Sequence, residues 1–285
     1  MQIEPKPAQI QSALFELFIK VVAILEREKI DYWLDFGTLL GAVRHKDFIP
    51  WDDDIDLAIP YESVNRVIDL IASDLSNLVT LAVPEEGNPV TVTCRIGLKG
   101  VFGVEKNLDS MGVSREYSPN VALDIFAMEF HSASFSMKKM RLWRAFLSKI
   151  WQVKRLAPFV SEEFVKAKYS SLGTWVVFMI ALVPDKFLAF FTSPNCDKKV
   201  NSKKISHVIE SSFANITVDS NTVYPLRHID FRGLTCLAPN DAERYLSSIY
   251  GRDFMTIPSK SNRITHFDKI LIERESPWRE FFVSN

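Results

Sequence analysis

The sequence lacks several features that mark large classes of protein, and each absence argues against one of these classes. Only three cysteines occur in 285 residues, and none lies in a Cys-x-x-Cys spacing. An odd and scattered count predicts neither a disulfide framework nor a zinc site, and it is typical of a reducing compartment. We interpret all three as small buried apolar side chains: Cys94, Cys196 and Cys236.

Charge of one sign, long apolar runs and common phosphate-binding signatures are missing as well. Lys and Arg (34) nearly balance Asp and Glu (35), so we expect no nucleic-acid partner. The most apolar segment, residues 175–183, is far shorter than the about 20 residues that span a membrane. No Gly-x-x-x-x-Gly-Lys-Ser/Thr loop occurs. The first residues have no basic segment before an apolar one, so we expect no secretory signal.

The composition and periodicity that are present predict a folded α/β domain. Hydrophobic residues make up 47% and charged residues 24%, which is ordinary for a soluble protein. Apolar spacing predicts helices at residues 8–29, 38–45 and 61–75, the second of them capped by Thr38. Shorter runs predict strands at residues 30–37, 54–60, 90–100 and 121–128. We find no internal repeat and expect one domain over residues 1–285.

The second half of the chain begins with a change in amino-acid composition. Residues 132–202 are rich in basic and aromatic side chains at helical spacing, and we interpret them as a helical insert. Residues 203–285 predict two short strands and then a helix with Asn240 as its N-cap. Within the insert, one helical stripe is flanked by basic residues: Trp143, Leu147 and Trp151 beside Lys138, Lys139, Arg141 and Arg144. Two readings stay open, packing on the protein's own core and contact with an anionic membrane surface.

An acidic cluster stands directly before an apolar strand. The segment Trp-Asp-Asp-Asp-Ile-Asp-Leu-Ala-Ile places four carboxylates within five residues: Asp52, Asp53, Asp54 and Asp56. Side chains alternate along a strand, so Asp54 and Asp56 share one face at a spacing of roughly 6–7 Å. Oxygen-only ligands favour Mg²⁺ or Mn²⁺ over zinc. A solvated loop is the competing reading, but the apolar strand would bury Asp56, and an unpaired buried charge is costly.

Two further observations refine the cluster. An EF-hand calcium loop would need Gly and Glu where the chain has Leu57 and Ser63, so that class is excluded. Gly37 and Thr38 lie between a predicted strand and a predicted helix, where free backbone N–H groups can bind phosphate. A Gly-Thr pair about fifteen residues before an Asp-x-Asp strand is the pattern of a nucleotidyltransferase core.

Two blocks of the sequence resemble the LicD family. The first is YWLDFGTLLGAVRHKDFIPWDDDIDLAI, and the second is DFRGLTCLAPNDAERYLSSIYGRDFMTIP followed by RITH. The resemblance implies a nucleotidyltransferase-like α/β fold, with a small mixed sheet flanked by helices. The chain lacks the zinc-binding cysteine cluster of animal members and is more similar to the compact bacterial ones, so we predict no structural metal.

The activity that the resemblance implies is Mg²⁺-dependent (or Mn²⁺-dependent) phosphotransfer. A phosphorylated alcohol, with phosphocholine favoured, would pass from a CDP-activated donor to a hydroxyl of a cell-surface glycan such as lipopolysaccharide or teichoic acid. Two alternatives stay open: a cytidylyltransferase that makes the CDP-alcohol from CTP, and a non-catalytic member that binds a glycan or a partner. The implied location is the cytoplasm, with peripheral contact to the inner face of its membrane and a lipid-linked glycan as acceptor.

The resemblance also assigns roles to residues. The metal ligands and catalytic acids would be Asp54, Asp56 and Asp124, with Asp124 taking the acceptor proton. The donor's phosphates would meet Gly37, Thr38, Arg44, His45, Lys46, Arg263 and His266, although a solvated loop is the alternative for the last two and a solvated turn for Lys46. Tyr250, Gly251 and Met255 would shape the nucleotide pocket. We interpret three other histidines as structural: His131, His207 and His228.

Overall fold

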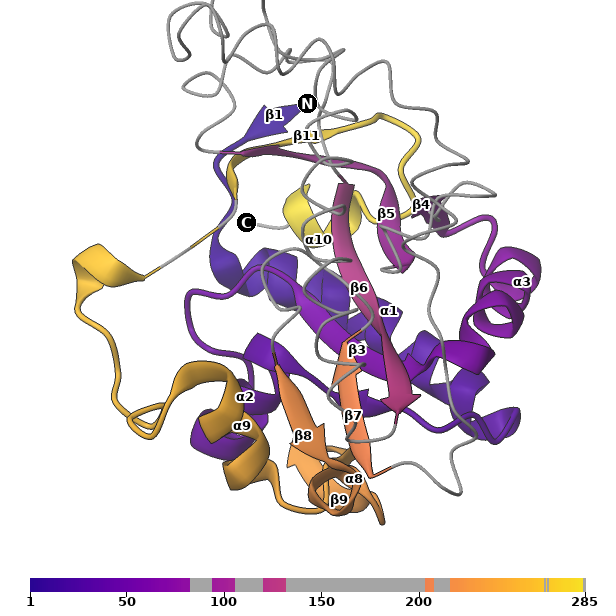
Figure 1. Ribbon diagram of the computed structural model, residues 1–285. Helices are drawn as coiled ribbons and strands as arrows, with labels where there is room; N and C mark the ends of the chain where they lie inside the picture. Colours follow the sequence, from indigo (N-terminus) through magenta and orange to yellow (C-terminus); the bar gives the residue numbers. More distant parts are fainter. Residues whose placement is uncertain are drawn as a thin grey trace, which may run out of the picture.

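A computed structural model describes residues 1–82, 94–105, 120–131, 203–207, 216–263, 265 and 267–283 (Figure 1). The predicted helical insert at residues 132–202, with its stripe and basic residues, lies outside the described residues. So do Cys196 and His266.

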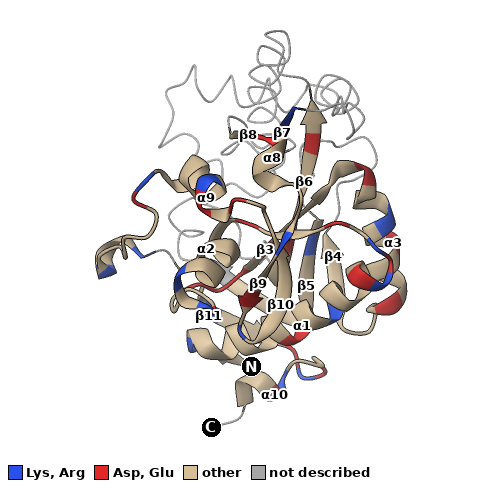
Figure 2. Cartoon of the chain, turned by 90° about the horizontal axis from the view of Figure 1, so that it is seen from below, with Lys and Arg blue, Asp and Glu red and all other residues tan. Residues whose placement is uncertain are grey.

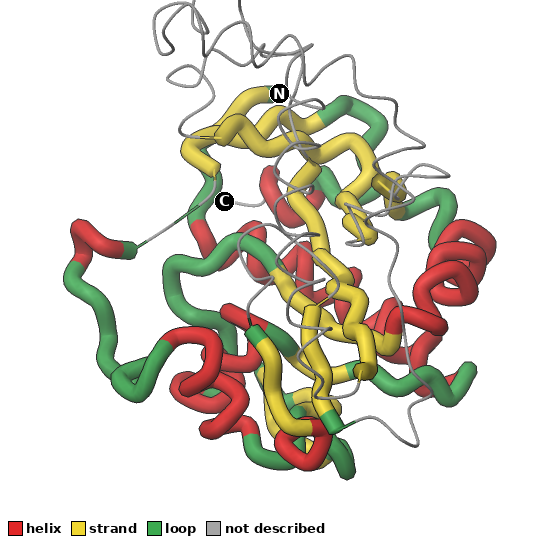
Figure 3. Tube along the Cα trace, in the orientation of Figure 1, coloured by secondary structure: helices red, strands yellow, loops and turns green. Residues whose placement is uncertain are grey.

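A mixed sheet forms the centre of the described chain (Figure 3). Its main path runs β1 (Gln2–Ile3), β11 (Phe267–Ile272), β5 (Cys94–Glu105), β6 (Asn120–His131), β3 (Ile55–Pro60) and β2 (Trp33–Leu34). Three more strands join it: β4 (Val79–Ala82) beside β5, and β7 (Lys204–His207) and β8 (Thr217–Asp219) beyond β6. Among the described strands, only β3 and β6 pair in parallel. A mixed sheet is therefore confirmed, but with nine described strands it is larger than predicted.

The helices pack around this sheet, and a two-stranded hairpin completes the described fold. The hairpin consists of β9 (Arg227–Phe231) and β10 (Leu234–Ala238). The helices of two turns or more are α1 (Pro7–Arg27), α2 (Phe36–His45), α3 (Val64–Asp74) and α9 (Ala242–Tyr250). Shorter turns are η1 (Tyr61–Ser63), α8 (Ser220–Val223), η4 (Lys260–Asn262) and α10 (Glu280–Val283). The segment after α9 runs outward, at the left of Figure 1, before the chain returns to β11.

Helix α1 confirms the prediction made from apolar spacing. It begins at Pro7, a residue whose fixed φ suits the first helical position. Its buried stripe includes Leu14, Leu17, Phe18 and Val21, none of them exposed to solvent. By length and hydropathy α1 is also able to cross a membrane, but 56% of its most apolar window is buried in the protein.

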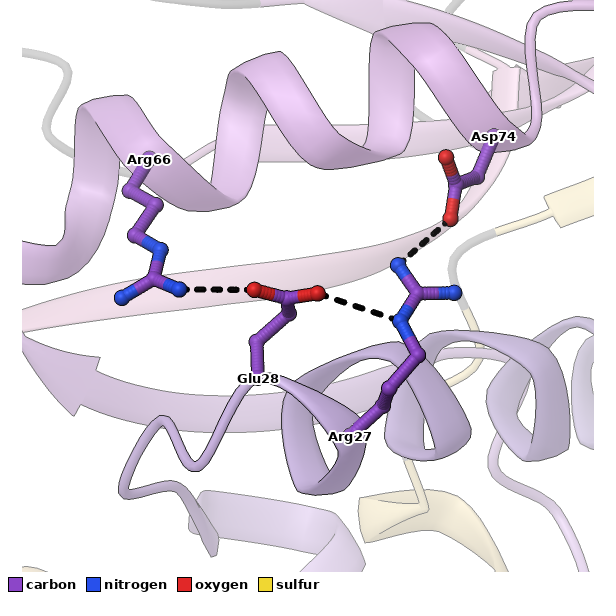
Figure 4. A network of polar contacts seen from close by, with 4 residues as sticks. All are labelled: Arg27, Glu28, Arg66 and Asp74. Carbon is purple, nitrogen blue, oxygen red and sulfur yellow. Dashed lines mark hydrogen bonds and ion pairs between the residues drawn. The ribbon is translucent and has the colours of Figure 1, made fainter.

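The surface of the described chain carries acidic and basic residues interspersed, as on α3 in Figure 2. At one place they form a network that joins the end of α1 to α3 (Figure 4). Arg27 donates to Asp74 at 2.7 Å and to Glu28 at 3.1 Å, and Arg66 donates to Glu28 at 2.6 Å. The four side chains are between 26% and 60% exposed, so the network orients the two helices more than it stabilises them.

Several local predictions require correction. The strand predicted at residues 30–37 is only β2, because α2 already begins at Phe36. Its N-cap is Asp35, whose carboxylate accepts the N–H of Phe36, so Thr38 is not the cap. Helix α9 is likewise capped by Asp241, which accepts the N–H of Arg244, and not by Asn240. In both cases an aspartate occupies the position directly before the first helical residue, where a carboxylate can accept a free N–H of the first turn.

Candidate active site

Three charged side chains lie side by side across the central strands. The register places Asp56 of β3 opposite Asp124 of β6, and Asp124 opposite Arg95 of β5. Residues directly opposite each other on paired strands project from the same face of a sheet. Asp56 and Asp124 therefore meet on neighbouring strands, and Arg95 is a neighbour that the sequence analysis missed.

Arg95 binds the carboxylate of Asp124 through two nitrogen atoms of its guanidinium group. Its Nε donates to Oδ1 and its Nη2 to Oδ2, each at 2.8 Å. A planar fork matched to both oxygens of one carboxylate is the strongest geometry for such a pair. The side chain of Asp124 is 10% exposed, whereas that of Arg95 is 40% exposed, so the guanidinium borders solvent.

Asp56 is buried, as Asp124 is, with 7% of each residue exposed. Its backbone N–H donates to the hydroxyl of Thr38 at 2.8 Å, and its carbonyl accepts the N–H of Asp35 at 3.1 Å. Both backbone groups of Asp56 are thus held by the first turn of α2. Burial first, and then the neighbouring charges of Asp54 and Asp124, raise the pKa of the Asp56 carboxyl well above its ordinary value.

The rest of the acidic segment divides between two roles. Asp54 lies just before β3 and is only partly buried. Its charge contributes to the raised pKa of Asp56, so the two carboxylates lie near each other. Asp53 is buried, and its carboxylate accepts the N–H of Phe267 at 3.1 Å. Asp53 therefore ties the acidic loop to the start of β11.

Gly37 brings the first turn of α2 against the acidic loop. A Cβ built on Gly37 would lie 2.7 Å from Oδ2 of Asp52, closer than side chains approach one another. Only a glycine allows this approach without moving the carboxylate. A larger residue at this position would thus displace Asp52 whether or not a phosphate binds there.

A buried polar cluster lies beneath this turn, and the sequence analysis did not find it. The carboxylate of Asp35 accepts the Tyr245 hydroxyl at 3.0 Å, and its Oδ2 lies 2.7 Å from Nε2 of His207. All three residues are at most 1% exposed. Phe36 follows with φ of 35°, in the left-handed region that non-glycine residues rarely adopt, and its ring stacks on His207. His207 is structural, as predicted, but it supports the site directly.

The far end of α2 meets the segment after α9. Nη1 of Arg44 donates to the carbonyl of Phe254 at 3.1 Å, and its Nε donates to Nε2 of His45 at 2.9 Å. Burial and the charge of Arg44 lower the pKa of His45, so this ring is neutral near pH 7. Lys46 is exposed at the helix end, where it adopts a left-handed backbone.

Tyr250, at the end of α9, faces the acidic cluster. Burial, and then the charges of Asp56, Asp35, Asp52 and Asp54, raise the pKa of its phenol far above the ordinary value. The residue is nevertheless 44% exposed, so one edge of the ring is open to solvent. The pocket-shaping role of Tyr250 stays a prediction, and in that role the raised pKa would keep its hydroxyl protonated.

Arg263 lies on the outward segment and stacks over the ring of Trp51, with 4.2 Å between its guanidinium carbon and the ring centroid. Trp51 directly precedes the acidic residues, so this contact places Arg263 beside their loop. Met255, on the same segment, is 51% exposed. The structure therefore brings Arg263 to the cluster, although it shows no contact that would identify a phosphate ligand.

The donor atoms present suit a hard divalent cation. Asp54, Asp56 and Asp124 offer only carboxylate oxygens, and a cation would relieve the repulsion that raises the pKa of Asp56. In the described residues, however, no three His, Cys, Asp or Glu side chains stand ready to hold a metal ion as they are. Both oxygens of Asp124 accept a hydrogen bond from Arg95, so a metal ion at Asp124 would compete with the guanidinium for this carboxylate.

Comparison with known proteins gives a match over half of the chain. Residues 29–171 match the family model for the LicD/FKTN/FKRP nucleotidyltransferase domain. The lipopolysaccharide cholinephosphotransferase LicD of Haemophilus influenzae is 54% identical over 48 residues, which are 17% of this chain and 18% of that protein. The ribitol 5-phosphate transferase FKRP of Mus musculus is 45% identical over 67 residues, which are 24% of this chain and 14% of that protein. The matched segments thus span less than a fifth of either relative.

Proposed function

The chain belongs to the LicD/FKTN/FKRP family of nucleotidyltransferase domains, and we propose that it transfers a phosphorylated alcohol from a CDP-activated donor to a hydroxyl of a glycan. The names of its relatives support this class, since one is a cholinephosphotransferase and the other a ribitol 5-phosphate transferase. The stronger bacterial match favours phosphocholine as the transferred group and lipopolysaccharide or a teichoic acid as the acceptor.

One observation carries the proposal: Asp56 and Asp124 lie opposite each other on parallel strands, with Asp54 just before the first of them. Carboxylates crowded in this way raise the pKa of Asp56, and bound cations reverse such an effect. We propose Mg²⁺ or Mn²⁺ as the cofactor, held by Asp54, Asp56 and Asp124. The bound ion would supply charge stabilisation for the phosphoryl oxygens.

The residues of the chain then position the reactants. Phosphoryl transfer needs orientation and charge compensation more than covalent help from the protein. Arg44, at the far end of α2, and Arg263, beside Trp51, would orient the donor's diphosphate together with the first turn of α2. The acceptor hydroxyl would give its proton to Asp124 as its oxygen bonds to phosphorus. The bond from that phosphorus to the bridging oxygen would break, and CMP would leave.

Location and membrane contact are part of the same proposal. We propose that the chain works in the cytoplasm, at the inner face of the membrane, where lipid-linked glycans are accessible. The basic and aromatic stripe in residues 132–202 supports contact with an anionic surface. Flotation with anionic vesicles at low and high salt tests this contact.

The direct test of function measures CMP release. The protein is incubated with Mg²⁺, a glycan acceptor and a panel of CDP-alcohols that includes CDP-choline and CDP-ribitol. We expect one donor to be consumed, and Asp56→Asn to lower kcat by at least about a hundredfold because charge stabilisation is lost. Asp74→Asn, an exposed carboxylate in the network of Figure 4, is the matched control and should keep full activity. Release of pyrophosphate from CTP and a phosphorylated alcohol, without CMP release, would instead identify a cytidylyltransferase.

A further inference from the structure

Arg95 occupies a position that conflicts with the proposed metal site. Its two N–H···O contacts of 2.8 Å take up both oxygens of Asp124, one of the carboxylates proposed as metal ligands. A divalent cation bound to Asp124 would also lie close to the guanidinium, and like charges at that distance repel each other. The guanidinium and a bound cation therefore compete for Asp124, and the competition is relieved when something negative binds between them.

The surroundings of Arg95 allow its head group to move while its backbone stays fixed. Its backbone is held between two strands, since it lies opposite Ala82 of β4 and Asp124 of β6. Its side chain is 40% exposed, against 10% for Asp124, so the guanidinium reaches solvent on the open side of the row. A long side chain whose backbone is held in a sheet and whose tip is partly exposed can exchange one oxygen ligand for another.

The chemistry of the guanidinium indicates what the second ligand is. The same fork that fits a carboxylate also fits two oxygens of a phosphate. A diphosphate donor that binds together with its cation carries negative charge. It would give Arg95 a new anionic partner once the cation has bound Asp124. The carboxylates of Asp52, Asp54 and Asp124 all raise the pKa of Asp56, so acidic groups crowd the site when no cation is bound. Arg95 is a basic group bound within this site.

We propose that Arg95 is an exchangeable counter-ion of this site. In the protein without metal and donor it neutralises and orients Asp124. When a divalent cation and a CDP-alcohol bind, the cation takes Asp124, and the Arg95 guanidinium moves to the donor's phosphate oxygens. This inference rests on the proposed function, and it makes Arg95 a donor-binding residue that also sets the affinity for the metal.

The test separates the two effects by measuring binding without turnover. Calorimetry gives the affinity for Mn²⁺ in the donor-free protein, and then the affinity for CDP-choline at saturating Mn²⁺ without acceptor. Arg95→Gln removes the competitor of the metal and the ligand of the phosphate. We expect Mn²⁺ to bind about tenfold tighter and CDP-choline about tenfold more weakly, as is usual for the gain or loss of one charged contact.

Two variants serve as controls. Arg66→Gln removes a more exposed arginine, 60% against 40%, from an ion pair on α3 and should change neither affinity. Arg95→Lys keeps a positive charge beside Asp124 but loses the fork, so Mn²⁺ affinity should stay near that of the unmodified protein while CDP-choline still binds more weakly. If Arg95→Gln does not fold, Arg95→Lys alone decides, because unchanged donor affinity in that variant overturns the proposal.

The outcomes distinguish this inference from the proposed function. Weaker Mn²⁺ binding by Arg95→Gln, with unchanged CDP-choline affinity, would mean that Arg95 only holds Asp124 in place, and the exchange would be wrong. If the unmodified protein binds no Mn²⁺ at all, the proposed metal site fails and the exchange fails with it. If Mn²⁺ binds and Asp56→Asn abolishes the binding, the proposed site stands whatever Arg95 does.

Discussion

The cluster of Asp35, His207 and Tyr245 and the network of Figure 4 contain polar contacts of the same length in opposite surroundings. The His207–Asp35 contact and the Arg27–Asp74 contact both measure 2.7 Å. The side chains of the first pair are 1% and 0% exposed, and those of the second are 55% and 30% exposed. Water competes for every group in the network and for none in the cluster.

The difference shows that contact length does not determine what a polar contact contributes. Exposed ion pairs lose most of their energy to solvent and salt, so the network can change with little consequence. Removing one member of the cluster leaves buried polar groups without a hydrogen-bond partner, which costs far more than the contact itself contributes. The cluster also holds the turn at Phe36 that places Thr38 against Asp56.

The largest effect on stability should come from Asp35→Ala. This change removes the N-cap of α2 and the acceptor that serves both His207 and Tyr245, and we expect a loss of about 3–5 kcal/mol. Tyr245→Phe removes one of the hydrogen bonds and should cost only about 0.5–1.5 kcal/mol. Urea denaturation measures both, with Glu28→Ala as the exposed control. The comparison fails if Asp35→Ala and Glu28→Ala prove equally mild.

A smaller effect concerns how stability depends on pH without metal. Because the pKa of Asp56 is raised in the folded state, the folded chain binds more protons than the unfolded chain above the ordinary carboxyl value of 3.8. Stability should therefore fall as the pH rises from that value through the folded pKa. Asp56→Asn should remove this fall and be more stable than the unmodified protein at neutral pH, although it is inactive. A denaturation series in EDTA measures this, and identical pH profiles for the two proteins would contradict it.

The smallest effect should come from the network itself. Hydrogen bonds from Arg66 and Arg27 lower the pKa of Glu28, so its contribution is present at neutral pH and is lost as the pH falls. The group is fully solvated, so Glu28→Gln should shift the denaturation midpoint slightly at low salt and not measurably at high salt. A loss as large as that of Asp35→Ala, or one that salt does not reduce, would show that exposure is a poor guide here.

The sequence predicted the elements with strong periodicity and the acids at strand ends. Helix α1 follows from its apolar stripe, and β3 with Asp56 follows from an acidic run before apolar residues. Asp124 came from the family resemblance, and the register confirmed that it lies opposite Asp56. Cys94 and Cys236 are buried and free, as expected.

The contacts between distant segments could not be predicted from one sequence. Arg95 resembles any other basic residue on a strand until the pairing of β5 with β6 places it on Asp124. His207 lies in no motif, and Tyr245 lies in the second family block without a role that the block assigns to it, so only the tertiary fold brings them to Asp35. The N-caps of α2 and α9 were misplaced by three residues and by one, because Asp35 and Asp241 accept the hydrogen bond instead of Thr38 and Asn240.

The long separations within the site have a consequence for the order of folding. Asp35 meets His207 across 172 residues and Tyr245 across 210, and Asp53 meets Phe267 across 214. Closing such long loops is entropically costly, so contacts of this kind tend to form late. During synthesis the acidic strand leaves the ribosome well before the residues that support it. A fragment that ended with the family match at residue 171 would contain all three proposed metal ligands and still lack the cluster that orients the turn beside them.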